Sequence, residues 1–197
     1  MSRIGFLGGT FDPIHHGHLI MASYAAYDLA LDQVLVMPAQ TPPHKQGKTI
    51  SDAQDRVAMA RLAIAPDPRL QLSTLDLQSS EPSYSSALLE RLKAERPGDE
   101  LVFIIGADSL RDFPRWHRPD LILEQAQLAV ANRPGVEIDD AILEGVPGLR
   151  ERSTIFSSPL IDISSTDIRN RVREGRPITW LVPPEVERYI VRHSLYT

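Results

Sequence analysis

Residues 3–18 read Arg3-Ile-Gly-Phe-Leu-Gly-Gly-Thr-Phe-Asp-Pro-Ile-His-His-Gly-His18. The apolar run at 3–7 predicts a buried strand that ends at Gly8 and Gly9, and the apolar side chains over about 17–30 recur at helical spacing. Glycines between a strand and a helix let backbone N–H groups approach an anion closely, and the start of the helix adds positive potential. We interpret this stretch as a strand, a turn and a helix that together bind an anionic ligand.

Two histidines of this stretch, His15 and His18, lie three positions apart. If the helix has begun, they share a face and both imidazoles reach one phosphate group. Two other interpretations stay open: a tight turn with capping histidines, or a zinc site formed by the neighbouring histidines with Asp12. We favour phosphate, because Gly8 and Gly9 would have no role beside a metal ion and no other ligand cluster supports one.

The rest of the chain alternates apolar strands with helices. The further predicted strands are 34–37, 70–77, 101–105, 128–131 and either 154–156 or 161–163, and the further predicted helices are 52–65, 85–96, 165–173 and 184–193. This alternation indicates an α/β fold, a Rossmann-like doubly wound parallel sheet with helices on both faces. We expect a single domain over residues 1–197, in which about 160–197 form a C-terminal helical extension.

The composition is that of an ordinary globular protein: 197 residues, 42% hydrophobic and 24% charged, with a formal net charge of −5. The absence of cysteine excludes a disulfide scaffold, a thiolate zinc site and a cysteine nucleophile. No apolar run approaches the ~18 residues of a membrane span and no secretory signal pattern is present, so we expect a cytoplasmic protein that binds no membrane. The acidic balance does not support binding to nucleic acid.

A second signal lies at residues 163–169, which read Ile-Ser-Ser-Thr-Asp-Ile-Arg. Ser and Thr at the start of a helix are helix caps in the simplest interpretation. Arg169, however, falls one turn inside the predicted helix, where its guanidinium can join the hydroxyls and free backbone amides around a polyphosphate. We therefore expect residues from both ends of the chain to gather around one triphosphate.

Two further segments follow predicted strands. Gly106 permits close approach to a backbone, and Asp108 could accept hydrogen bonds from a ribose, although taken alone it fits a helix cap equally well. The long irregular segment 38–49 is basic and carries Lys45. Long loops of this kind are often functional, so we expect this one to contribute to the site.

Together these residues resemble the bacterial nicotinate-nucleotide adenylyltransferases, members of the nucleotidyltransferase superfamily. The resemblance covers essentially the whole chain and rests on Gly-Gly-Thr-Phe-Asp-Pro-x-His-x-Gly-His at 8–18, Pro43-His44-Lys45, Gly106-Ala107-Asp108, Trp116 and Ile-Ser-Ser-Thr-x-Ile-Arg at 163–169. The catalytic residues that it implies are His15, His18, Lys45 and Arg169. The implied nucleotide-binding residues are Gly8, Gly9, Thr10, Phe11, Gly106, Asp108, Ser165 and Thr166. The implied acceptor-binding residues are Ser85, Trp116, His117 and Arg133, and no residue is expected to be a dedicated metal ligand.

The resemblance implies that ATP and nicotinic acid mononucleotide bind and that Mg²⁺ is held mainly through substrate phosphates. A phosphate monoester has a second pKa near ~6 and is largely ionised at neutral pH, so the reaction requires no general base. We expect catalysis by positioning and by neutralisation of charge, with His15, His18, Lys45 and Arg169 supplying positive groups.

Several alternatives stay open on the sequence. The acceptor could be nicotinamide mononucleotide or pantetheine phosphate, or the chain could be a nucleotide-binding protein without catalytic activity. A homo-oligomer is also left open. One departure from the family pattern is visible, because the Ser-Tyr-Thr-x-Asp-Thr-Leu element reads Ser-Tyr-Ser-Ser-Ala-Leu-Leu at 83–89. This loss of the acid and of the second threonine leaves open which side chains contact the acceptor there.

Overall fold

The computed structural model describes residues 1–41, 50–79, 82–132, 138–159 and 161–197. Within them, six parallel strands form one sheet in the order β3-β2-β1-β4-β5-β6. The strands are β1 (Arg3–Gly9), β2 (Gln33–Pro38), β3 (Leu70–Leu72), β4 (Glu100–Gly106), β5 (Gln127–Asn132) and β6 (Ser153–Ser157). The central strand β1 pairs with β2 on one side and with β4 on the other, so the direction of winding reverses between β1 and β4.

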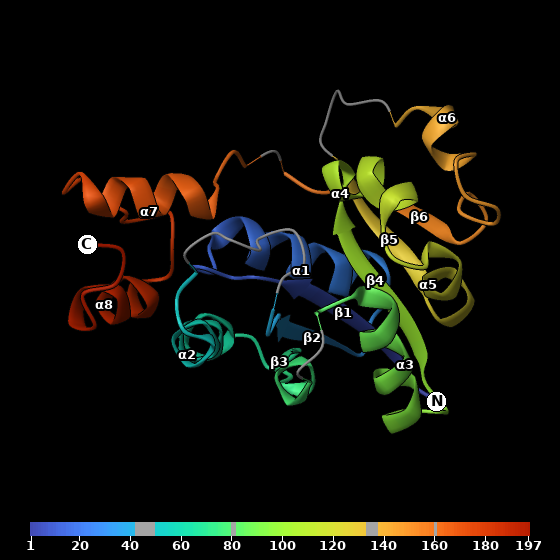
Figure 1. Cartoon of the computed structure of the whole chain (residues 1–197), viewed down its shortest axis with the longest axis horizontal. Helices are drawn as coiled ribbons and strands as arrows, with labels where there is room; N and C mark the ends of the chain where they lie inside the picture. Colours follow the sequence, from blue (N-terminus) through green and yellow to red (C-terminus); the bar gives the residue numbers. More distant parts are fainter. Residues whose placement is uncertain (42–49, 80–81, 133–137, 160) are drawn as a thin grey trace.

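Helices cover both faces of this sheet (Figure 1). One face carries α1 (His16–Asp28), α2 (Ala53–Ile64), α7 (Ser165–Arg173) and α8 (Pro184–Arg192). The other face carries η2 (Leu75–Gln78), α3 (Ser85–Glu95), α4 (Ala107–Asp112), η3 (Phe113–Arg115), α5 (Pro119–Gln125) and α6 (Asp140–Leu143). The predicted doubly wound α/β fold is therefore confirmed.

Alternation along the strands explains why two apolar cores form. In β1, Ile4 and Phe6 enter the core beneath α3 and α5, whereas Leu7 enters the core beneath α1 and α2. Successive strand side chains point to opposite faces, and a parallel strand that is covered on both faces must be apolar at every position. This requirement produces the continuous apolar runs from which the strands were predicted.

The structure corrects one predicted strand and decides between two others. The strand predicted at 70–77 ends at Leu72, and η2 follows. Leu75 and Asp76 are consecutive and both buried, which a 3₁₀ turn allows and a one-sided strand does not. At the other edge of the sheet, 154–156 belongs to β6, whereas the described residues of 161–163 form no strand.

The last two helices pack into the same core as α1 and α2. They lie at one end of the molecule (Figure 1). Ile168 of α7 and Val186 and Ile190 of α8 belong to the same buried cluster as the α2 residue Met59. The C-terminal segment is thus packed against the helices that lead away from β1 and β2. Among the described residues, the search for a helix long and apolar enough to cross a bilayer finds none.

Candidate active site at the ends of strands β1 and β4

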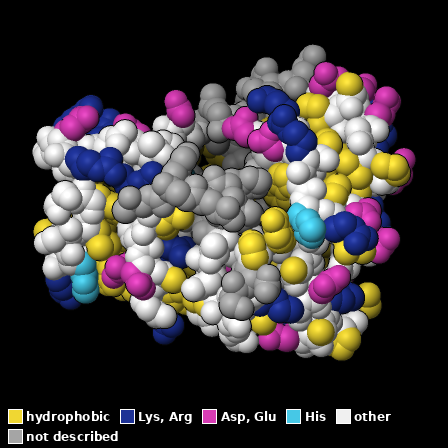
Figure 2. Space-filling view, viewed as in Figure 1, with side chains coloured by type: hydrophobic (Ala, Val, Ile, Leu, Met, Phe, Trp, Pro, Cys, Tyr) yellow, Lys and Arg dark blue, Asp and Glu magenta, His cyan; other side chains and the backbone are white. Residues whose placement is uncertain are grey.

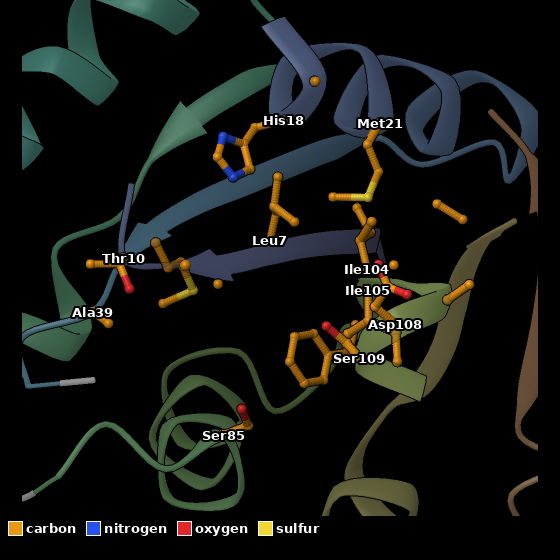
Figure 3. Close-up of a pocket in the computed structure, with 18 of the residues that line it drawn as sticks. Leu7, Thr10, His18, Met21, Ala39, Ser85, Ile104, Ile105, Asp108 and Ser109 are labelled. Carbon is orange, nitrogen blue, oxygen red and sulfur yellow. The ribbon is translucent and has the colours of Figure 1, made fainter. Parts of the chain in front are cut away.

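A cavity of about 770 Å³ lies at the carboxyl ends of β1 and β4. This is the point where the strand order reverses, which is where open α/β sheets bind their ligands. Its volume falls in the range of about 300–1,000 Å³ that small-molecule sites occupy. In Figure 3, His18 and Met21 of α1 lie above the strand ends, Ser85 of α3 lies on the opposite side, and Asp108 of α4 closes one end.

The structure brings most of the predicted site residues to this cavity. Those that line it are Gly8, Gly9, Thr10, His15, His18, Ser85, Gly106, Asp108, Trp116 and His117. Four others are described but do not line it: Phe11, Ser165, Thr166 and Arg169. The remaining two, Lys45 and Arg133, lie outside the described residues.

The two glycines at the end of β1 differ in their surroundings. A Cβ on Gly8 would meet no atom of the described residues within 4 Å, which leaves this backbone open on their side. A Cβ on Gly9 would lie 2.8 Å from the ring of Phe11. Phe11 itself has a left-handed φ of 51° and is 2% exposed. Gly9 is therefore required by packing, and Phe11 is a core residue rather than part of the cavity wall.

His15 and His18 stack on each other, with ring centroids 3.7 Å apart. The His15 backbone N–H donates to Nδ1 of His18 at 3.2 Å, so the neutral His18 ring carries its proton on Nε2. The edge of the Phe11 ring packs against His18, with centroids 5.0 Å apart. Both histidines thus sit at the start of α1, where the helix N-terminus is positive. The turn-with-capping interpretation is correct for the local geometry, since His18 receives a backbone N–H, and it is compatible with phosphate binding.

His15 corrects one expectation. Its side chain is 6% exposed, and burial, assisted by the nearby His16, lowers its pKa to about 4. His15 is therefore a neutral donor or acceptor at neutral pH and not one of the expected positive groups. Its Nδ1 is buried without a hydrogen-bond partner among the described residues.

The α7 residues reach the segment after β1 instead of the cavity wall. Ser164 caps α7 by accepting from the Asp167 backbone N–H at 3.1 Å, which confirms the capping interpretation for that position. The Ser165 hydroxyl donates to the carbonyl of Pro13 at 2.9 Å, and Arg169 donates to the carbonyl of Asp12 at 2.7 Å. The second motif therefore meets the first one, as the sequence suggested, through contacts that fix residues 12–13.

The Thr166 hydroxyl has a more local role. It accepts from the second terminal nitrogen of Arg169 at 3.3 Å and so orients the guanidinium. In this arrangement the roles expected for Ser165 and Thr166 beside ATP remain predictions.

Aromatic side chains gather at the end of the cavity away from the histidines. Trp116 is half-buried, with its ring 5.5 Å from that of Phe113 and 5.9 Å from that of Phe103. His117 stacks on Tyr84, with ring centroids 4.3 Å apart. Tyr84 immediately precedes α3, so the backbone N–H groups of the first helical turn, which have no partner within the helix, lie beside these rings. An aromatic face and a helix N-terminus together suit a flat, anionic ring.

Gly106 and Asp108 lie between the two ends of the cavity. A Cβ on Gly106 would meet no atom within 4 Å in the part of the chain that the structure describes, and Gly106 rather than Asp108 is the N-cap of α4. The cap interpretation of Asp108 is therefore wrong. Its exposed carboxylate lies 3.7 Å from Arg111.

Sequence reasoning missed the residue that joins the loops behind the cavity, Arg56. Its side chain is 2% exposed and donates to the carbonyls of Thr10, Ala39, Gln40 and Ser51 at 2.9, 2.7, 3.4 and 3.1 Å. Desolvation lowers the pKa of Arg56, and neighbouring carboxylates, Asp12 first, oppose that shift. A signal was present, because Arg56 lies on the apolar stripe of α2 with Met59, Ala60 and Ala63.

Asp76 plays a similar part beneath the aromatic end. It is 1% exposed, accepts from the Gln40 backbone N–H at 2.9 Å and pairs with Arg91 at 3.0 Å. It therefore ties the segment after β2 to α3. On the face shown in Figure 2, acidic and basic side chains are interspersed, so the electrostatics of the site depend on local groups.

Comparison with known proteins agrees with this geometry. A sequence model described as Cytidylyltransferase-like matches residues 6–171. The chain is 48% identical over 197 residues to "Probable nicotinate-nucleotide adenylyltransferase" of Thermomicrobium roseum, with 100% of this chain and 92% of the relative covered. It is 45% identical over 194 residues to the protein of the same name from a Roseiflexus species, with 98% and 97% covered.

The fold agrees with a solved structure as well. Plasmodium falciparum nicotinic acid mononucleotide adenylyltransferase complexed with APC superimposes with a TM-score of 0.81 at 21% identity, covering 100% of this chain and 98% of that one. The complex of the same protein with NaAD gives the same values. At this identity the likeness shows the fold, and the relatives at 48% and 45% identity show the family. The chain belongs to the cytidylyltransferase-like proteins and, among them, to the nicotinate-nucleotide adenylyltransferase family.

Proposed function

We propose that this chain transfers the adenylyl group of ATP to nicotinic acid mononucleotide, giving nicotinic acid adenine dinucleotide and pyrophosphate. The observation that carries the proposal is the division of one cavity into two chemically different ends. One end has His15, His18 and the open backbone of Gly8 for phosphates, and the other has Trp116 and the start of α3 for a flat ring with a carboxylate.

The reaction needs few proton transfers. An oxygen of the mononucleotide phosphate attacks the α-phosphorus of ATP, and the bond from that phosphorus to the oxygen bridging to the β-phosphate breaks, so that pyrophosphate leaves. The attacking phosphate is already ionised at neutral pH. Catalysis therefore consists of holding two anions in line and stabilising the charge that develops on the leaving group.

The chain's own groups fit this task. His18 presents an Nε2–H from the start of α1, and neutral His15 lies stacked against it. Arg169 donates to the carbonyl of Asp12, three positions before His15 in the chain. We assign the binding of the ATP phosphates to His15, His18 and the backbone at Gly8 and propose that Arg169 supplies positive charge beside them.

Mg²⁺ fits the same site as an ion that enters with the triphosphate. The described residues contain no group of three His, Cys, Asp or Glu side chains that could hold a metal ion, and the cavity wall at the ATP end offers backbone amides and imidazoles. Such donors complement phosphate oxygens, which are the usual protein-site ligands of Mg²⁺ together with water. When bound, the ion would neutralise charge on the β- and γ-phosphates.

The acceptor end distinguishes this proposal from its alternatives. Trp116, supported by Phe103 and Phe113, offers a rigid aromatic face of the kind that stacks on a pyridine ring. Pantetheine phosphate has no ring to use this face. The N–H groups at the start of α3, which have no partner within the helix, favour the carboxylate of the nicotinate ring over the neutral amide of nicotinamide.

A pyrophosphate-release assay tests the proposed function. Purified protein is incubated with Mg²⁺-ATP and, separately, nicotinic acid mononucleotide, nicotinamide mononucleotide or pantetheine phosphate. We expect kcat/KM to be highest with the nicotinate acceptor. A higher value with either other acceptor would reassign the substrate, and ATP binding without pyrophosphate release from any of them would show a non-catalytic nucleotide-binding protein.

A further inference from the structure

Residues 12–16, which connect the end of β1 to α1, are held by the C-terminal segment at several points. Arg169 and Ser165 donate to the carbonyls of Asp12 and Pro13, and the His16 backbone N–H donates to the carbonyl of Leu181 at 3.0 Å. All of these contacts reach only the backbone. One further contact reaches a side chain of the segment, and it comes from Tyr196.

The Tyr196 hydroxyl donates to Oδ1 of Asp12 at 2.8 Å, across 184 positions of sequence. Asp12 is 2% exposed, and its other oxygen accepts from the Ser51 backbone N–H at 3.3 Å. The Tyr196 hydroxyl also lies 4.0 Å from the sulfur of Met59, so it contacts α2. Burial and the Asp12 carboxylate raise the pKa of Tyr196, so the phenol stays protonated and acts as the donor at every physiological pH.

A buried carboxylate that accepts a phenol O–H is a strong, directional contact, because hydrogen bonds to ionised acceptors are about twice as strong as neutral ones. Asp12 lies between Thr10 and His15, two residues that line the cavity. Moving Asp12 therefore moves both the backbone at the end of β1 and the histidine pair at the start of α1. Reacting atoms misplaced by about 1 Å can cost a factor of about 10² in rate.

We propose that Tyr196 is a positioning residue for adenylyl transfer. Through its hydrogen bond to Asp12 it holds residues 12–16, which carry His15, in the position that ATP binding requires. The proposal rests on the proposed function and deepens it. Tyr196 does not line the cavity, so its proposed action is indirect, through Asp12. Its effect is expected on the ATP end of the site only, because the aromatic end is built from α3 and η3.

The chain offers a matched control, Tyr189. Its hydroxyl donates to Oδ1 of Asp55 at 2.8 Å, which is the same kind of bond, from the same C-terminal segment, to a residue of α2. Asp55 does not line the cavity. Tyr189→Phe therefore removes a phenol–carboxylate hydrogen bond of the same length, to a half-buried acceptor, that does not reach residues 12–16.

The test compares Tyr196→Phe with Tyr189→Phe by steady-state kinetics at a temperature well below both unfolding midpoints. We expect Tyr196→Phe to lower kcat/KM for ATP about 10- to 100-fold, with a lower kcat and a higher KM for ATP. The KM for the mononucleotide should stay within twofold of the wild-type value, as should every constant of Tyr189→Phe. Lower thermal stability of Tyr196→Phe with unchanged kinetic constants would show a purely structural role and overturn the proposal, as would equal losses in the two variants.

A second variant keeps the test decisive if Tyr196→Phe does not fold. Asp12→Asn retains the size of the side chain and weakens the acceptor, so it should show the same pattern, a loss confined to kcat and to the KM for ATP. Wild-type kinetics in folded Asp12→Asn would overturn the proposal. ATP affinity, measured by calorimetry on the same proteins, separates this proposal from the proposed function. Wild-type protein that binds ATP but transfers the adenylyl group to no acceptor refutes the function. Equal ATP affinity in wild type and Tyr196→Phe refutes the positioning role.

Discussion

The backbone N–H of His15 donates to Nδ1 of His18, which fixes the orientation of the second imidazole and leaves its proton on Nε2. With Nδ1 occupied, the Nε2–H of His18 is left as a donor of fixed direction at the positive N-terminus of α1. The role that the family resemblance implied for His18 therefore has a local structural basis. It also defines the first experiment.

His18→Ala is expected to lower kcat/KM by about 10²–10³, the size of the loss when a donor to the transition state is removed. The fold should remain intact, because His18 is only half-buried at the start of α1. Steady-state kinetics and far-UV circular dichroism check both statements. His193→Ala, an exposed histidine at the end of α8, is the control and should retain wild-type activity.

Trp116→Ala should raise the KM for the mononucleotide about 10-fold or more and leave the KM for ATP nearly unchanged. The reason is the loss of a stacking face, worth about 1–3 kcal/mol for a base on an aromatic side chain. Trp180→Ala, which removes a tryptophan that is 82% exposed, is the control. Equal increases in the two KM values would contradict the assignment of Trp116 to the acceptor end.

The buried His15 predicts a specific loss of stability in acid. Its pKa is about 4 in the folded chain and near 6.5 when exposed, so the unfolded state binds the proton first as the pH falls. The contribution of neutral His15 to the free energy of unfolding is complete above pH 6.5 and is lost as the pH falls toward 4. Between pH 7 and pH 5 this residue should reduce the free energy of unfolding by about 2 kcal/mol. Urea denaturation at the two pH values should show a smaller decrease in His15→Gln, and identical decreases would contradict the prediction.

Arg56→Met should destabilise the protein by about 3 kcal/mol or more, because it leaves buried backbone carbonyls without a donor. Arg61→Met, at an exposed position of the same helix, should change the free energy of unfolding by less than about 0.5 kcal/mol. Denaturant unfolding of the two variants measures this difference. Similar stabilities would show that the carbonyls find other partners.

The two glycines at the end of β1 should respond differently to alanine. In Gly9→Ala the new methyl group would lie 2.8 Å from the Phe11 ring, so we expect about 1–3 kcal/mol of destabilisation. In Gly8→Ala the methyl group meets none of the described residues within 4 Å, so stability should be unchanged while the KM for ATP rises. Thermal unfolding and ATP kinetics on both variants separate the packing role from the ligand role.

The sequence was sufficient for the parts of the site that depend on local pattern. Local sequence pattern alone predicts the turn after β1, the start of α7 and most of the apolar strands. The structure has these elements where the pattern predicts them. The strand predicted at 70–77 was too long, because the alternating pattern continues into η2. There Asp76 is buried and accepts hydrogen bonds from Gln40 and Arg91, which are distant in sequence. Short helices such as α4 and α5 carry too few residues for a periodic signal.

What the sequence could not supply are states and contacts that arise from folding. The neutral state of His15 follows from burial, and the contact between Tyr196 and Asp12 joins residues 184 positions apart. Neither has a local pattern. Arg56 did have one, a charged residue on an apolar stripe, which indicates a buried cation that binds backbone carbonyls.

Ser165 and Arg169 donate to residues 12–13 and the Leu181 carbonyl accepts from His16, so these bonds link segments more than 150 positions apart. Helices α7 and α8 lie at one end of the molecule (Figure 1). Such distant contacts form late, after the loops between them have closed, and a peripheral helix pair opens more readily than the central strands. On heating, we therefore expect enzymatic activity to be lost at temperatures where far-UV circular dichroism still shows the native sheet. Amide exchange should be faster across α7 than along β1 and β4.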